Sequence, residues 1–288
     1  MGWTLRDKTV LITGAARGIG AETARQLHDE GARLVLVDVD TEPLGKLAAQ
    51  LGSAVITARA DVRDMSAVQQ AVHAGIEEFG GIDIAVANAG IASYGSVLAV
   101  DPETFARVID VNVTGVFHTV RASLPSVMER RGYVLVVSSL AAFGAMPGMA
   151  AYNASKAGVE HFANTLRLEV RHLGVDVGCA HMSWVDTPLL RDAREDLRTF
   201  DEAVATMPRP LNRTATVESC GCAFVKGIAG RKRHVYVPGW VAAVAQARNL
   251  INSPIGERDA LKHVPERLPL MDEEVRRLGR STSARNLD

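Results

Sequence analysis

The sequence predicts an α/β protein built on one doubly wound parallel sheet of about seven strands, in three layers. Three observations predict it: short apolar runs alternate with longer helical patterns, the apolar residues of each run are mostly consecutive, and no internal repeat or low-complexity linker interrupts the order. Consecutive apolar residues are typical of a parallel strand that helices bury on both faces. We therefore expect one domain over residues 1–239 and a C-terminal helical extension over 240–288.

Seven runs are predicted as strands because each is short and most are rich in Val, Ile or Leu. In chain order they are Thr9–Thr13, Leu34–Val37, Ala54–Ala58, Ile84–Ala87, Tyr133–Val137, Val175–Cys179 and His234–Val237. Helical patterns fill the gaps between them, for example Ile19–Glu30, Met65–Phe79, Pro102–Arg130 and Ala151–Leu173. Strands and helices in this order imply right-handed crossovers, which place helices on both faces of the sheet.

Composition excludes several classes of function. Of 288 residues, 47% are hydrophobic and 23% charged, and the formal net charge is −1, so we expect a sizeable core and no nucleic-acid partner. Three cysteines without a Cys-x-x-Cys pair favour a reducing compartment over a disulfide framework. With no signal-peptide core and no apolar run of about 18 residues, we expect a cytoplasmic protein without a membrane span. The eight histidines lack metal-site spacing, so we expect no metal.

A glycine-rich turn follows the first predicted strand. The sequence TGAARGIG over residues 13–20 brings three glycines to the point where the strand ends and a helix begins. Backbone N–H groups and a helix N-terminus can approach a pyrophosphate there without Cβ collisions. The alternative is a turn without a ligand, but its place between strand and helix favours a dinucleotide site. The predicted contacts are Gly14, Arg17, Gly18, Ile19 and Gly20.

The second predicted strand is followed directly by Asp38. A carboxylate here can accept both ribose hydroxyls of an adenosine and repel a 2′-phosphate, although a solvated strand-end Asp is the alternative. Arg17 is evidence against the ribose-binding role of Asp38, because a cation in the turn could attract a 2′-phosphate. Val39 supplies no basic partner, and the repulsion by Asp38 would act at short range. We therefore expect NAD as the cofactor.

Tyr152 and Lys156 form a candidate catalytic pair. Four residues apart in a predicted helix, they share one face. A phenol with a pKa of about 10 is a poor base at neutral pH, but an adjacent ammonium and an oxidised nicotinamide would both lower that pKa. A surface tyrosine packed on a lysine stem is the alternative. Ser138 and Ser139 follow the fifth strand, where the carboxyl ends of strands form the ligand crevice and a hydroxyl could hold the substrate oxygen.

Together these motifs resemble the short-chain dehydrogenase/reductase (SDR) family over roughly residues 5–239. Further motifs that carry the resemblance are Asp61-Val62, Ala87-Asn88-Ala89-Gly90 and Asn112 in Val111-Asn112-Val113. The resemblance implies a Rossmann-like fold and an NAD-dependent oxidoreductase that acts on CH–OH groups. It also implies a homodimer or homotetramer, because the helices matching Phe105–Met128 and Val159–Val170 pair across a two-fold axis in the family.

The resemblance also assigns roles to the catalytic residues. It implies that Tyr152 is the general acid/base, that Ser139 orients the substrate oxygen, and that Asn112 holds a water in the proton relay. Lys156 would bind the nicotinamide ribose and acidify Tyr152. The implied cofactor contacts are Asp61 and Val62 at the adenine, Asn88, Ala89 and Gly90 along the cofactor's path, and Thr187 at the carboxamide.

The sequence departs from the family pattern after the sixth strand. Where the family usually has Pro-Gly, this chain has Met182-Ser183-Trp184-Val185-Asp186-Thr187. The turn thereby loses the freedom of glycine and the stiffness of proline, so we expect changes in nicotinamide position and cofactor affinity. The first Asn of the family's Asn-Asn-Ala-Gly is Ala87 here, which is a mild change.

The predicted substrate region is apolar and carries no obvious cationic clamp. It includes the variable substrate loop, residues 188–211, and predicts a hydrophobic secondary alcohol or its ketone as substrate. We expect about half of the wall candidates to be ordinary core. Arg191, Arg194 and Arg198 recur at helical spacing and indicate a solvated face. The wall candidates are Ile91, Tyr94, Leu140, Phe143, Met146, Met149, Trp184, Leu189, Leu190, Phe200, Met207 and Leu211.

The C-terminal extension begins with a short apolar helix, Trp240–Ala245, and its last eight residues are predicted to be disordered. It would cover the substrate crevice or pack against a neighbouring subunit, with peripheral membrane contact as the alternative. Other functions remain open at this point: an idle NAD(H)-binding regulator, an NADP-dependent carbonyl reductase, or a carbonyl-group isomerase or lyase. The intact Ser-Tyr-Lys set argues against the regulator.

Overall fold

The computed structural model describes residues 3–287, which are organised around one seven-stranded sheet with the order β3-β2-β1-β4-β5-β6-β7. All neighbouring strands are parallel, so the predicted doubly wound α/β fold is confirmed. β6 runs three residues beyond the predicted Cys179, because His181 and Met182 also pair with β7. The strands are β1 (Thr9–Thr13), β2 (Arg33–Asp38), β3 (Val55–Arg59), β4 (Ile84–Ala87), β5 (Tyr133–Val137), β6 (Asp176–Met182) and β7 (His234–Val237).

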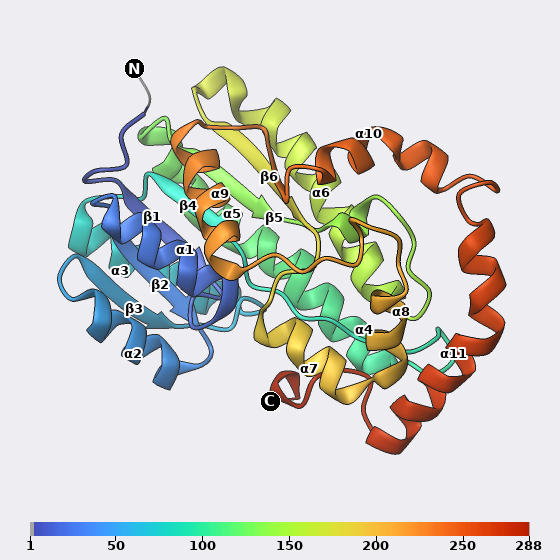
Figure 1. The fold of residues 1–288 in the computed structure, drawn as a ribbon. Helices are drawn as coiled ribbons and strands as arrows, with labels where there is room; N and C mark the ends of the chain where they lie inside the picture. Colours follow the sequence, from blue (N-terminus) through green and yellow to red (C-terminus); the bar gives the residue numbers. More distant parts are fainter. Residues whose placement is uncertain (1–2, 288) are drawn as a thin grey trace.

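Helices cover both faces of the sheet (Figure 1). Alternate residues of the central strands enter opposite cores: in β2, Leu34 and Leu36 pack on one side, and Val35 and Val37 on the other. This explains the consecutive apolar residues of the central strands, since both of their faces are covered by helices. The edge strand β3 is partly exposed. One layer contains α1 (Gly18–Asp29), α2 (Thr41–Leu51) and α9 (Val217–Ala229); the other contains α3 (Met65–Phe79), α5 (Gly115–Glu129) and α6 (Ala150–Val170).

The predicted helix Pro102–Arg130 is not one continuous α-helix. It divides into α4 (Pro102–Ile109), a π-helical segment (Asp110–Thr114) and α5. The π segment contains Asn112, whose side chain exchanges two hydrogen bonds with the main chain of Ile91. Hydrophobic periodicity cannot reveal one wide turn inside a helix, and such turns are often found at functional sites.

Four further helices border the region beyond the carboxyl ends of the central strands (Figure 1). They are α7 (Pro188–Asp196), α8 (Arg198–Ala205), α10 (Val241–Ile251) and α11 (Arg258–Leu278). No helix within residues 3–287 is long and apolar enough to cross a membrane.

The C-terminal tail, residues 281–287, folds back onto the body where the sequence predicts disorder. Ser281, Thr282 and Ser283 are buried, and Thr282 forms an antiparallel bridge with Ser93. The Thr282 hydroxyl donates to the carbonyl of Ala92 at 2.6 Å, and Ser283 donates to Asp192 at 2.7 Å. These hydrogen bonds hold the tail in a defined conformation, although its composition alone predicts disorder. Asp288, the last of the predicted disordered residues, lies outside the described residues.

Candidate active site

A single cavity of about 1040 Å³ runs past the carboxyl ends of the strands and brings most of the predicted site residues together. Of the predicted set, Gly20 and Asn112 do not contribute to its wall. Those that line it are Gly14, Arg17, Gly18, Ile19, Asp38, Asp61, Val62, Asn88, Ala89, Gly90, Ser139, Tyr152, Lys156 and Thr187.

The glycine turn between β1 and α1 leaves no room for side chains. Gly14 has a φ of +65°, and a Cβ on it would lie 2.8 Å from Cα of Ala89. A Cβ on Gly20 would lie 2.2 Å from the carbonyl oxygen of Gly14. Asn88 fixes the turn from the end of β4, donating from Nδ2 to the carbonyls of Thr13 at 2.9 Å and Gly14 at 3.0 Å. A helix N-terminus that opens onto the cavity in this way fits a pyrophosphate group.

Asp38 lies at the end of β2 and faces the same cavity. Its carboxylate accepts from the amides of Ala16 at 2.8 Å and Asp40 at 3.1 Å. Burial raises its pKa, and these amide hydrogen bonds offset part of that effect. Arg17, the cation that could attract a 2′-phosphate, is paired with the carboxylate of Asp40. The local charges therefore fit an unphosphorylated ribose.

Asp61 is also engaged before any ligand binds. It accepts from Nε of Arg63 at 2.8 Å and from the Arg63 amide at 2.9 Å. Burial tends to raise the pKa of Asp61, but the Arg63 contacts outweigh it and the pKa is lowered. The ionised carboxylate and its arginine thus form a fixed polar edge beside Val62, in the part of the wall predicted to receive adenine.

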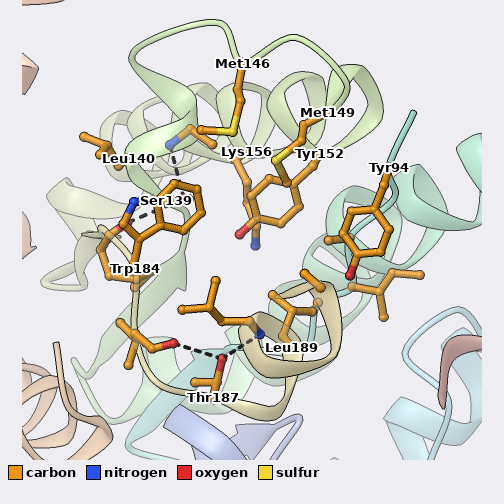
Figure 2. Close-up of a pocket in the computed structure, with 18 of the residues that line it drawn as sticks. Tyr94, Ser139, Leu140, Met146, Met149, Tyr152, Lys156, Trp184, Thr187 and Leu189 are labelled. Atoms are coloured by element: carbon orange, nitrogen blue, oxygen red, sulfur yellow. Dashed lines mark hydrogen bonds between the residues drawn. The ribbon is translucent and has the colours of Figure 1, made fainter. Parts of the chain in front are cut away.

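The predicted catalytic side chains converge at the start of α6. Ser139 follows β5, and its Oγ accepts from the amide of Ala141 at 3.1 Å and lies 3.5 Å from the carbonyl oxygen of Met182. Nζ of Lys156 lies 5.5 Å from the centre of the Tyr152 ring and donates to the carbonyl of Val137 at 3.1 Å. Figure 2 shows the Tyr152 hydroxyl and the Lys156 ammonium pointing into a space that other lining residues border.

The two serines after β5 have different environments. Ser138 is buried, and its hydroxyl donates to the main-chain carbonyl of Lys156 at 2.7 Å, which fastens α6 to the sheet. The Ser139 hydroxyl, in contrast, has only a long contact of 3.5 Å to the carbonyl of Met182 as a donor, so its proton is more readily available to a ligand. The geometry therefore favours Ser139 over Ser138 as the residue that meets a substrate oxygen.

Burial is the largest influence on the pKa values of Tyr152 and Lys156. It raises the pKa of Tyr152, an effect that the Ser139 side chain opposes, and it lowers the pKa of Lys156 to about 8. The sequence predicts a lowered pKa for Tyr152 next to an ammonium and an oxidised nicotinamide. In the protein alone the direction is the opposite, because desolvation acts against both charged forms. The positive charge of an oxidised nicotinamide would then be the main source of phenolate stabilisation.

Asn112 is fully buried and its side chain is already engaged. Oδ1 accepts from the amide of Ile91 at 2.8 Å, while Nδ2 donates to the Ile91 carbonyl and to Oγ of Ser155, each at 2.9 Å. It therefore ties the segment after β4 to α6. A Cβ on Gly90 would lie 3.3 Å from both the Asn112 Oδ1 and the Lys156 Nζ, so these groups are closely packed. That Asn112 holds a water of the proton relay stays a prediction.

The turn that replaces Pro-Gly is held by hydrogen bonds instead of by a proline ring. The Ser183 amide donates to Val237 of β7, and the Trp184 carbonyl accepts from Ala215, both at 2.8 Å. The Trp184 indole donates to the carbonyl of Leu211 at 2.8 Å, so the tryptophan also anchors the end of the substrate loop. Thr187 then caps α7, its hydroxyl accepting from the amide of Leu190 at 3.4 Å.

The predicted substrate wall is largely assembled, with one exception. Phe143 does not line the cavity; it is buried and stacks on His181 with ring centres 4.6 Å apart. The other eleven candidates line the cavity, more than the predicted half, because most lie both in a packed cluster and on its surface. The three arginines of the substrate loop form ion pairs and do not line the cavity: Arg191 with Asp186, Arg194 with Asp201 and Arg198 with Glu202.

Sequence reasoning missed the contribution of α11 to this wall. Val264, Leu268 and Met271 recur at helical spacing and face the cavity, and Arg267 lies among them. The spacing was available in the sequence, but two prolines inside the helix, Pro265 and Pro269, obscured it. The sequence predicts no obvious cationic clamp among the wall candidates; Arg267 is a cation that α11 adds from outside that set.

Comparison with known proteins agrees with this geometry. A family model described as short chain dehydrogenase matches residues 8–198. An uncharacterised NAD-dependent oxidoreductase of Mycobacterium tuberculosis is 34% identical over 207 residues, covering 66% of this chain and 75% of the relative. A (−)-trans-carveol dehydrogenase of Rhodococcus erythropolis is 36% identical over 206 residues, covering 65% and 74%.

A solved structure gives the same answer for the fold. The crystal structure of a short chain dehydrogenase/reductase from Burkholderia phymatum in complex with NAD superposes with a TM-score of 0.74 at 26% identity, covering 88% of this chain and 98% of that one. Fold, site geometry and sequence similarity agree, and the chain belongs to the short chain dehydrogenase family.

Proposed function

We propose that this protein is an NAD-dependent dehydrogenase that interconverts a hydrophobic secondary alcohol and its ketone by hydride transfer. One observation carries the proposal: a single cavity joins a glycine turn and a ribose-binding carboxylate to a Ser-Tyr-Lys group with an apolar wall. A protein that only binds the cofactor would need the glycine turn and the carboxylate alone. The Ser-Tyr-Lys group supplies side chains that can transfer a proton.

The cofactor end of the cavity fits NAD. The turn from Gly14 to Ile19 would hold the pyrophosphate, and Asp38 would accept the hydroxyls of the adenosine ribose. Asp61 and Val62 would border the adenine, and the segment Asn88–Gly90 would line the path to the nicotinamide. Thr187 would bind the carboxamide. The bound cofactor supplies a hydride acceptor or donor at its nicotinamide ring, and similar proteins named as NAD-dependent or solved with NAD support this choice.

Tyr152 is the residue that moves the proton. During alcohol oxidation its phenolate takes the hydroxyl proton, and during ketone reduction its phenol returns one. Ser139 donates a hydrogen bond to the substrate oxygen and so fixes the distance to Tyr152. Lys156 stabilises the phenolate and binds the nicotinamide ribose, which explains why an ammonium is kept in a buried position. Asn112 supports a water that passes the proton on.

The wall of the substrate end supports an apolar substrate. Its side chains are predominantly aliphatic, aromatic or thioether groups, including Tyr94, Met146, Met149, Trp184 and Phe200. A site of this kind gains affinity mainly by removing apolar surface from water. Carveol, a cyclic secondary alcohol, is a suitable probe, because one similar protein is named a carveol dehydrogenase.

Two further expectations belong to the same proposal. Phe105, Phe117 and Leu168 of α4, α5 and α6 are 40%, 47% and 69% exposed, and we propose that a homodimer or homotetramer covers them. Light scattering that finds only monomer at micromolar concentration would contradict this. Three free cysteines fit a reducing cytoplasm. We also retain one catalytic domain over residues 1–239, with residues 240–288 completing its wall.

The test is a turnover screen with NAD⁺ over cyclic, aromatic and aliphatic secondary alcohols, with carveol among them, repeated with NADP⁺. We expect NADH formation with apolar alcohols and a higher kcat/KM with NAD⁺. If NAD⁺ binds and no alcohol or ketone is converted, the protein is a regulator or an isomerase on this fold. Faster turnover with NADP⁺ would make the assignment of Asp38 wrong.

A further inference from the structure

Helix α11 carries an arginine on the substrate wall that the proposed reaction does not use. Val264, Leu268 and Met271 of this helix form an apolar stripe along the cavity, and Arg267 lies on the same face, half-buried. Asp259 and His263 of the same helix also line the cavity, with 3.8 Å between Oδ1 of Asp259 and Nε2 of His263. A cation that loses hydration beside the apolar stripe requires a partner. Whether that partner already neutralises the charge decides whether Arg267 can bind a ligand at the substrate end of the cavity.

The polar partner of Arg267 is a hydroxyl, not a carboxylate. Its Nη2 donates to Oγ1 of Thr206 at 3.0 Å. Three other arginines of the cavity wall form ion pairs: Arg17 with Asp40, Arg63 with Asp61 and Arg285 with Asp192. A fourth, Arg107, donates to the main-chain carbonyl of Asn286 near the predicted adenine end. Among the described residues no comparable ion pair forms at Arg267, so its charge and most of its five N–H donors remain available to a ligand.

The position of Arg267 is fixed by the packing of α11 on α8. Both oxygens of Glu274 accept from the amide of Thr199 at the start of α8, at 3.2 and 3.3 Å, while Arg267 meets Thr206 just beyond its end. Seven residues separate the two contacts on each helix, about 10 Å along an α-helix, so the pair is antiparallel and in register. The guanidinium is therefore held in place before a ligand binds.

Two more groups support this arrangement, one on α11 and one at Thr206. Asp272, five residues further along α11, anchors the helix by accepting from the amide of Ser96 at 2.7 Å and from its hydroxyl at 2.6 Å. Thr206 donates its own proton to the carbonyl of Ala203 at 3.1 Å, which leaves a lone pair directed to Arg267. A donor group oriented by such supports costs little to order when it binds an acceptor.

We propose that the substrate is an apolar secondary alcohol, or its ketone, that carries a carboxylate at the end remote from the carbinol, and that Arg267 binds this carboxylate. A single guanidinium fork matches the two oxygens of a carboxylate, whereas phosphate sites usually gather several cations. The apolar stripe of α11 would contact the hydrocarbon between the two ends. This inference rests on the proposed function, because Tyr152 must act at the carbinol.

Matched pairs of probes test it. The probes are (ω−1)-hydroxy fatty acids of increasing chain length and the methyl ester of each, oxidised with NAD⁺. The acid of the chain length that spans the distance from Tyr152 to Arg267 should exceed its ester in kcat/KM by roughly 10- to 100-fold, the value of a charge-assisted hydrogen bond. Arg267→Met should remove this preference by raising KM for the acid, and Arg267→Lys should keep part of it.

The control variant is Arg277→Met, which removes an exposed arginine of the same helix that pairs with Glu273. It should leave the acid-to-ester ratio unchanged. Oxidation of carveol, which has no carboxylate, should be the same in wild type and Arg277→Met. If Arg277→Met lowers the acid-to-ester ratio as much as Arg267→Met does, the preference comes from the packing of α11 and not from a contact of Arg267, and the inference would be wrong.

A binding experiment separates this inference from the proposed reaction. Calorimetric titration of the protein with dodecanoate and with methyl dodecanoate needs no turnover. We expect tighter binding of dodecanoate, lost in Arg267→Met and kept in Arg277→Met, even if no alcohol is oxidised. Equal affinities for acid and ester, or equal kcat/KM at every chain length, would overturn the inference while leaving the dehydrogenase proposal intact.

Discussion

The two ends of the cavity are built in different ways. At the cofactor end the shape of the wall depends on close backbone packing: glycines at the β1–α1 turn, and amides and carbonyls that Asn88 and Asp38 hold in place. At the substrate end the wall consists of side chains from helices far apart in the sequence, held by contacts such as Asp272 with Ser96 and Glu274 with Thr199. The substrate end can therefore change its chemistry without disturbing cofactor binding.

The largest expected effect is at the junction of the two ends. Tyr152→Phe keeps the ring and its packing but removes the exchangeable proton, so kcat should fall by about 10²–10⁴. Because the proposed role of Tyr152 is proton transfer, and the proposed pyrophosphate site lies at the glycine turn, NAD⁺ affinity should change little. Steady-state kinetics and nucleotide fluorescence on the folded variant measure the two effects separately. A variant that keeps more than about a tenth of the wild-type kcat is incompatible with this role.

Lys156 gives the next effect, on stability and its pH dependence. Burial lowers its pKa from 10.5 to about 8, so between these values the unfolded chain binds more protons than the folded one. The free energy of unfolding should therefore rise with pH across that window, by about 3 kcal/mol from this group. Denaturant titrations of the cofactor-free protein at several pH values should show the rise, and Lys156→Met should lack it.

Lys262→Met, which removes an exposed lysine of α11, is the matched control and should keep the wild-type profile. If the wild type and Lys156→Met show parallel profiles between pH 8 and 10.5, the assignment of a lowered pKa to Lys156 is wrong.

Asp38 gives a smaller effect, restricted to the cofactor end. Asp38→Ala removes the carboxylate that we propose accepts the ribose hydroxyls and repels a 2′-phosphate, so the preference for NAD⁺ over NADP⁺ should fall by roughly 10- to 100-fold. The ratio of kcat/KM values for the two cofactors measures it, with the KM for the alcohol as the internal control. A ratio that stays the same would indicate that Arg17, not Asp38, decides the choice.

The smallest effect concerns the tail, which touches both ends of the cavity. Asp192 binds Ser283 and Arg285 of the tail, and Arg107 of α4 donates to the carbonyl of Asn286. Asp192→Asn should loosen the tail, and the Kd for NAD⁺ and the KM for the alcohol should rise together, each by roughly threefold to tenfold. Glu202→Gln, at an exposed ion pair of α8, is the control. A change in only one of the two constants would mean that the tail serves one end alone.

The same contrast explains what could be predicted from the sequence. The cofactor end was predictable because each feature depends on residues close together in the chain, such as the three glycines of residues 13–20 or Asp38 after β2. The fold was predictable because strands buried between two cores need consecutive apolar residues, and such runs are visible in the sequence. Ser138 and Ser139 could not be separated by composition or spacing, and only the family resemblance assigned the role to Ser139. The path of α6 decides which hydroxyl holds the helix.

The substrate end was predictable only in its general apolar character. Phe143 turns away from the cavity because His181 offers a stacking partner, and no pattern in the sequence pairs these two residues. Arg267 reaches the wall because α11 packs on α8, a long-range contact between residues 61 positions apart. The ordered tail depends on partners such as Ala92, which lies 190 positions away. Local periodicity does not contain such information.

Transfer of deuterium from the carbinol carbon of an oxidised secondary alcohol to the cofactor tests the central claim most directly. The best alcohol from the turnover screen, labelled with deuterium at that carbon, would be oxidised with NAD⁺, and the NADH formed would be analysed by mass spectrometry. Direct hydride transfer in this cavity predicts that the NADH carries the deuterium on its nicotinamide ring and that Tyr152→Phe slows its appearance in proportion to kcat. NADH without the label, or label released into water, would contradict the proposed reaction.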